Sequence, residues 1–290
     1  DSRTTVDNYI RKDKSITRST NNSRTENNNL VANAFLEWKM DSVTTLIFRP
    51  QYRFSANGRE NKGFQEGWGN DVLLNEKVSS GSNHNSQYNV TMMLQLSRKL
   101  SQKGRNVALK VDYGTNSSSN DRKNLSTTHY FKNDREDSKN QKIEDDIDGY
   151  NYRVQLVYVE PLLWMHHLQL RYSYQYKVNN SDRFVYDWNE DLGEFTPDYD
   201  ESASNQFENQ YSNHLLNLAV RTSRKKYNYN VGVDLEPQKS VSHSLLSDPP
   251  EEPLKRSVLN FSPTVNFRYK FSKRTRLQIV YRGKGRQPNV

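Results

Sequence analysis

The sequence contains no cysteine, no long apolar run and few hydrophobic residues of any kind. The absence of cysteine excludes disulfides, thiolate catalysis and cysteine-based zinc sites. No segment reaches the run of about 18 apolar residues that a transmembrane helix needs. Hydrophobic residues make up 33% of the 290 residues, against roughly 45–50% in an average soluble domain. Such a chain is either largely disordered or arranges its few apolar residues in a regular pattern.

The basic residues form no continuous arm in the sequence. The chain has 42 Lys and Arg against 34 Asp and Glu, a net charge of +8. Nucleic-acid-binding proteins gather their basic residues on one face or arm, whereas here they are spread along the whole chain. The charge pattern therefore predicts no nucleic-acid partner.

The apolar residues recur in blocks of about eleven residues with a period of two. At 150–158, for example, the even positions are Tyr, Tyr, Val, Leu and Tyr, and positions 151, 153 and 155 are Asn, Arg and Gln. Disordered segments are poor in aromatic and β-branched residues, and alternation indicates strands with one apolar face. Strands are predicted near 30–40, 44–55, 87–99, 106–113, 150–159, 167–177, 212–222, 227–235, 257–271 and 275–283.

Short and long connections alternate strictly between these strands. The short ones lie near 41–43, 101–105, 160–166, 223–226 and 272–274, and the long polar ones near 56–86, 114–149, 178–211 and 236–256. Outer-membrane barrels have short periplasmic turns, long outer loops and an apolar band about 25 Å high, which a tilted strand of about ten residues spans. The sequence therefore predicts an all-β, antiparallel, up-and-down transmembrane β-barrel of about ten strands, with residues 1–29 as a polar outer segment, in the bacterial outer membrane.

The polar face of the strands would line the lumen if the apolar face lies against lipid. Its basic candidates are Arg49, Arg53, Lys110, Arg153, Arg171, Arg221 and Arg268. Carboxylates are fewer on this face, with Glu37, Asp112 and Asp234. A basic wall attracts an anionic solute or an acidic plug. The alternative is a solvated lumen wall that is balanced by partner segments.

No other pattern indicates catalysis, a cofactor or a metal. The stretches 182–201 and 144–148 are acidic, but neither is a 12-residue calcium loop, so calcium stays open and a solvated loop is the default. His166 and His167 are adjacent, and adjacent residues of a strand point to opposite faces instead of forming a metal pair. The chain has no GxSxG nucleophile elbow. The sequence thus predicts no enzyme activity.

The C-terminal segment carries a resemblance to a known family. In 277–288 a strand ending in Tyr281-Arg-Gly283 leads into Arg286-Gln-Pro288, which resembles outer-membrane β-barrel proteins of Bacteroidetes related to TonB-dependent receptors. The hairpin at 261–276 and the Tyr- and Asn-rich texture of the other strands are similar.

This resemblance implies a larger barrel, typically of about 22 strands, of which the chain would be an internal piece. It also implies import of a nutrient ligand of unknown identity, such as a glycan, a peptide or an iron chelate. The partners implied are outer-membrane lipid, a plug domain, TonB and a surface lipoprotein. The chain itself shows neither a plug nor an energy-coupling box.

Two alternatives remain. A soluble or surface-attached β-sandwich adhesin would also have alternating strands, but it gives no reason for lengthening every second connection. A ten-stranded outer-membrane enzyme would suit the strand number. The protease type, however, needs an Asp-x-His pair, and Ser212 and Asn213 precede His214.

Overall fold

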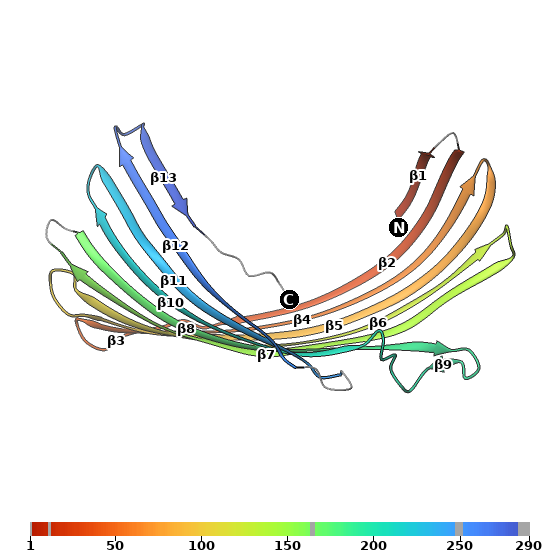
Figure 1. The fold of residues 1–290 in the computed structure, drawn as a ribbon, viewed down its shortest axis with the longest axis horizontal. Helices are drawn as coiled ribbons and strands as arrows, with labels where there is room; N and C mark the ends of the chain where they lie inside the picture. Colours follow the sequence, from red (N-terminus) through yellow and green to blue (C-terminus); the bar gives the residue numbers. More distant parts are fainter. Residues whose placement is uncertain (1, 11–12, 163–165, 247–251, 284–290) are drawn as a thin grey trace.

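The computed structural model describes residues 2–10, 13–162, 166–246 and 252–283, and within them thirteen β-strands (Figure 1). The strands are β1 (Ser2–Ile10), β2 (Asp13–Asn33), β3 (Leu36–Lys39), β4 (Thr44–Gly69), β5 (Val72–Lys99), β6 (Asn106–Tyr130), β7 (Arg135–Pro161), β8 (His166–Asn189), β9 (Glu194–Phe195), β10 (Asn205–Ser223), β11 (Tyr227–Ser244), β12 (Leu254–Lys270) and β13 (Arg276–Arg282). In this part of the chain, no helix has the length and apolar character required to cross a membrane.

The strands form one antiparallel meander in which the order in the sheet follows the order in the chain. The path runs β1-β2-β4-β5-β6-β7-β8-β10-β11-β12-β13, with β3 beside β4 and β9 beside β8. The sheet is strongly curved, and β1 and β13 are its two edges (Figure 1). This topology confirms the predicted all-β, up-and-down class, and a single continuous sheet excludes the two-layer sandwich.

Large apolar side chains form continuous rows across one face of the sheet. Directly paired residues share a face, and the registers join one such row: Trp38, Leu46, Leu96, Leu109, Leu156, Tyr172, Leu216, Leu235 and Phe261. Leu216 on this face is 47% exposed, whereas the neighbouring Asn217 on the opposite face is 5% exposed. Because curvature spreads side chains on the convex face and crowds them on the concave one, the apolar face is convex and the polar face concave.

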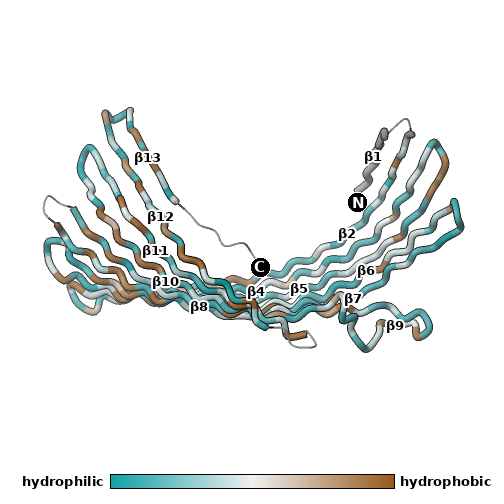
Figure 2. Tube along the Cα trace, in the orientation of Figure 1, coloured by the Kyte–Doolittle hydropathy of each residue, from teal (hydrophilic) through white to brown (hydrophobic). Residues whose placement is uncertain are grey.

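The described chain has very little interior. Its buried apolar residues are Ile143, Val159, Val185 and Ala219. Apolar positions gather toward the end of the sheet that carries the short turns, and the opposite half is mostly polar (Figure 2). A sheet with so few buried apolar residues depends on its backbone hydrogen bonds and on whatever covers its convex face.

The predicted long polar connections are mostly wrong, because the strands continue through them. β4 extends to Gly69 and β5 begins at Val72. Only Asn70 and Asp71 separate them, with φ of 49° and 63°, as a two-residue type I′ turn requires. Both faces are polar in these outer halves, so hydropathy no longer alternates, although backbone pairing is unaffected by side-chain polarity.

Two further boundaries differ from the sequence prediction. Residues 1–29, predicted as a polar outer segment, form β1 and most of β2, apart from residues 1 and 11–12, which lie outside the described residues. Of the predicted connection 178–211, only residues 190–204, with the short strand β9, lie outside β8 and β10.

A proline breaks the strand predicted at 30–40. β2 ends at Asn33 and β3 starts at Leu36, with the gap opposite Arg49 and Pro50 of β4. Proline has no N–H to donate to a ladder, and the remaining contact is the Ala34 N–H, which donates to the Pro50 carbonyl at 3.1 Å. The pairing resumes in the same register, so the break changes no side chain's face.

Candidate functional site on the concave face

All seven basic candidates predicted for the lumen lie on the concave face. The register joins Arg49, Met93, Asp112, Arg153, Gln175 and Asn213 in one cross-strand row. The other candidates occur in parallel rows on the same face: Arg53, Lys110, Arg171, Arg221 and Arg268. The fold therefore gathers them on one surface.

Carboxylates partly neutralise this surface. Lys110 Nζ lies 2.8 Å from Asp112 Oδ1, and Arg171 Nη2 lies 3.7 Å from Asp234 Oδ1. The buried Asn217 donates its side-chain amide to the same Asp234 oxygen at 2.6 Å. These partly exposed pairs contribute little to stability by themselves. They do fix the side chains in position on the concave face.

Other candidates contact neutral groups and form no ion pair with the described residues. Arg153 donates to Gln175 Oε1 at 2.6 Å, and Arg268 donates to Gln278 Oε1 at 3.4 Å. The Arg49 guanidinium lies 4.8 Å from the centroid of the Phe35 ring. Phe35, which interrupts the polar alternation in the sequence, thus provides a cation–π partner on the concave face.

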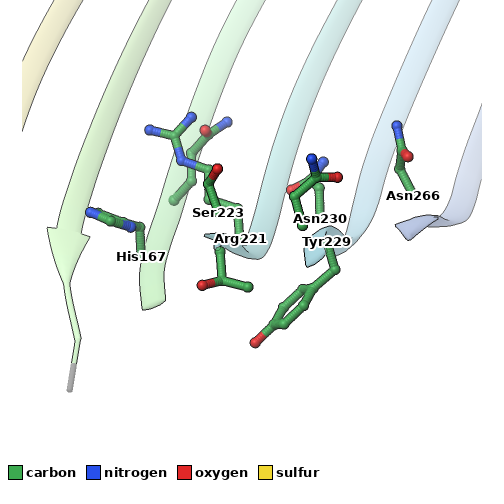
Figure 3. A pocket seen from close by; sticks show the side chains of 9 residues that line it. His167, Arg221, Ser223, Tyr229, Asn230 and Asn266 are labelled. Carbon is green, nitrogen blue, oxygen red and sulfur yellow. The ribbon is translucent and has the colours of Figure 1, made fainter. Parts of the chain in front are cut away.

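A pocket of about 500 Å³ lies on the concave face beside the short turns, and we refer to it as the inner pocket. Its lining residues are His167, Gln169, Arg221, Thr222, Ser223, Asn228, Tyr229, Asn230 and Asn266. His167, Arg221, Asn230 and Asn266 form one cross-strand row, and their side chains point to the same side of the sheet, opposite to the Tyr229 ring (Figure 3). One guanidinium among amides can bind an anionic, hydrogen-bonding group.

The outer half of the concave face carries an amide-rich row that the sequence analysis missed. It consists of Asn27, Asn57, Asn85, Asn120, Asp145, Arg183 and Asn205. A pocket of about 460 Å³ opens on it. Asp145 forms an ion pair with Arg122, and Arg183 Nε lies 3.9 Å from Asp145 Oδ1. From the sequence, these residues are predicted to lie in connections or in the polar outer segment. No strand pairing is predicted there, so these residues could not be recognised as neighbours.

The acidic loop 190–204 is arranged by its own hydrogen bonds. Asp200 accepts from the Ser202 backbone N–H at 2.8 Å and from the Ser202 hydroxyl at 2.7 Å, and these bonds lower the pKa of the Asp200 carboxyl. In the described part of the chain, no three His, Asp or Glu side chains converge as metal ligands do.

Two histidines pair separately with tyrosines on the convex face. His166 Nδ1 lies 2.8 Å from the Tyr229 hydroxyl, and His214 Nδ1 lies 2.8 Å from the Tyr172 hydroxyl. His167 points the other way, into the inner pocket. The two adjacent histidines therefore face opposite sides of the sheet, as the alternation predicted.

Comparison with family models decides the classification. The outer membrane protein beta-barrel family matches residues 98–290, two thirds of the chain. The chain belongs to the outer membrane protein β-barrel family. Its location is accordingly the outer membrane, as the sequence predicted. No curated protein matches the chain.

Solved structures with a similar fold include large outer-membrane receptors. The ferric preacinetobactin receptor BauA of Acinetobacter baumannii is 9% identical, with a TM-score of 0.43, over 88% of this chain and 45% of that one. The ferric citrate transporter FecA is 8% identical, with a TM-score of 0.43, over 92% and 40%. The alcaligin receptor FauA of Bordetella pertussis is 11% identical, with a TM-score of 0.40, over 89% and 41%. The chain thus spans less than half of the length of each of these receptors.

Proposed function

We propose that the chain is part of the barrel wall of a TonB-dependent nutrient importer or receptor of the Bacteroidetes type, with no enzymatic activity. The observation that carries the proposal is the gathering of seven basic residues on the concave face of an outer-membrane barrel sheet. A curved wall with uncompensated guanidinium groups favours an anionic solute over a cationic one of equal size.

In this proposal the convex apolar rows contact lipid and the concave face lines the lumen. The short turns lie on the periplasmic side and the outer halves of the long hairpins extend beyond the outer leaflet. There the amide-rich row provides hydrogen bonds to a nutrient, and the inner pocket provides a second polar binding site near the periplasm. The outer edges of β1 and β13 would be paired by further strands that close the wall, around a plug that couples to TonB.

The test is the charge preference of ion passage. The full-length protein, in which further strands close the wall, is reconstituted in planar bilayers, and the reversal potential is measured across a potassium chloride gradient. The proposal predicts a preference for chloride, which decreases when Arg153, Arg171 and Arg221 are all replaced by Gln.

The matched control replaces Arg24, Lys62 and Lys123 by Gln, because these three basic residues lie on the opposite face in the outer half. The control should leave the reversal potential unchanged. A cation preference in the unmodified chain, or an equal loss in both variants, would contradict a basic lumen wall.

A further inference from the structure

The positive charge of the chain is concentrated at one end of the sheet. We define the short-turn rim as residues 39–44, 98–105, 160–162, 166–167, 221–226 and 268–276. The rim contains fourteen Lys and Arg against two carboxylates, Asp41 and Glu160, a net charge of +12. The whole chain carries +8, so all the other residues together carry −4.

The opposite end of the sheet has the reverse polarity. The loop and strand ends at 187–201 contain seven Asp and Glu and no Lys or Arg. Basic residues that look spread along the sequence are thus sorted by the meander, because every second connection brings them back to the same end. The asymmetry is a property of the fold and of the turn sequences together.

Most of the rim charge is exposed, and Arg221 and Arg268 belong to the concave face described above. Twelve of the fourteen basic residues are exposed, and the other two, Arg224 and Arg268, are half-buried. Glu160 accepts a bidentate pair from Arg105, and Asp41 accepts from the backbone N–H groups of Val43 and Thr44. The two carboxylates therefore leave most of the rim uncompensated.

The rim directly borders the apolar convex rows. Arg98 is two residues from Leu96 on the same face, and Arg105 is four residues from Leu109. The Lys and Arg side chains have long apolar stems that lie along apolar surface while the charged group reaches the polar boundary. A basic belt at the edge of a lipid-facing surface lies at the depth of the phosphate groups of the adjacent leaflet.

We propose that the short-turn rim binds the phosphate headgroups of anionic phospholipids, phosphatidylglycerol and cardiolipin, in the leaflet that surrounds the short turns. Continuity of the rim with the exposed apolar rows favours lipid over a soluble acidic protein, because only lipid contacts both surfaces at once. The inference depends on the outer-membrane location of the chain but not on transport.

The test is a native mass-spectrometric titration of the detergent-solubilised chain with phosphatidylglycerol, cardiolipin and phosphatidylethanolamine of identical acyl chains. The rim variant replaces Lys225, Lys226, Lys273 and Arg274 by Gln, all exposed and all in two turns. The control replaces the same residue types at the polar end, Arg59, Lys123, Lys132 and Lys139, all exposed as well. Heat-modifiable gel mobility verifies that each variant is folded. Two half-variants, one with Lys225 and Lys226 replaced and one with Lys273 and Arg274 replaced, should each lose part of the lipid preference.

The unmodified chain should bind the anionic lipids at least about tenfold more tightly than phosphatidylethanolamine, since each basic residue near a lipid surface contributes several-fold. The rim variant should lose this preference and the control should keep it. An equal loss of the preference in both variants would show that it depends only on the net charge of the chain, and this would overturn the proposal. It would also be overturned if the unmodified chain bound the three lipids equally.

Discussion

Replacement of Leu109 by lysine tests whether the apolar rows contact lipid. Leu109 is 41% exposed and lies in the apolar part of β6, residues 107–113. A lysine near the middle of the bilayer destabilises an outer-membrane barrel by about 2–4 kcal/mol. If the convex face lay in water, the same substitution of a partly exposed side chain would cost less than about 0.5 kcal/mol. The measurement is the free energy of unfolding in denaturant, with the chain folded into lipid vesicles.

Leu125 is the matched control on the same strand and face. It is 36% exposed, and 16 residues of strand place it about 53 Å from Leu109, beyond an apolar band of about 25 Å. Leu125→Lys should therefore change the free energy of unfolding by less than about 0.5 kcal/mol. Equal costs at the two positions, or no cost at Leu109, would refute a lipid-facing band confined to the short-turn half.

Three further predictions concern the turns and the concave face. Asn217→Leu removes the donor to the Asp234 carboxylate and should lower the free energy of unfolding in vesicles by about 1–3 kcal/mol. An unchanged free energy of unfolding would show that this hydrogen bond does not stabilise the fold. The backbone N–H groups of Val43 and Thr44 lower the pKa of Asp41, so its stabilisation is present above the ordinary carboxyl pKa and is lost as pH falls through the lowered value. The carboxyl carbon of Asp41 should accordingly titrate below a free aspartate in NMR spectra, and a normal titration would contradict the capped turn. Asp71 has φ of 63°, so Asp71→Val should speed amide exchange at the tip of the β4–β5 hairpin while Asp71→Gly should not.

The membrane half of the fold was predictable because one physical signal fixes both the strand and its face. The period of two in 150–158 identifies β7 and also tells which side chains lie on its apolar face. The same alternation placed Arg49, Arg153 and Arg171 on one face before any register was known. Seven candidates could thus be assigned to a surface although they come from six segments of the chain.

The outer half was not predictable from that signal. Between Ala56 and Ser86 both faces of the hairpin are polar, so the sequence looks like a loop while the backbone continues as β4 and β5. The Asn70-Asp71 turn is the local clue, since few residues other than Asn, Asp and Gly tolerate consecutive positive φ. The amide-rich row could not be recognised, because the alignment of Asn85 with Asn120 and Asp145 exists only through the register of three strands.

The measurement that tests the account most directly is single-cysteine labelling of two adjacent residues, because the chain has no native cysteine. Gln155→Cys reports on the concave face and Leu156→Cys on the convex face, where Leu156 is 46% exposed in the protein alone. Each variant, folded in liposomes, is treated with a charged, membrane-impermeant maleimide. We expect rapid labelling at position 155 and protection at position 156 until the sample is denatured. Faster or equal labelling at position 156 in intact liposomes would show that the apolar face lies in water and would contradict the barrel-wall account.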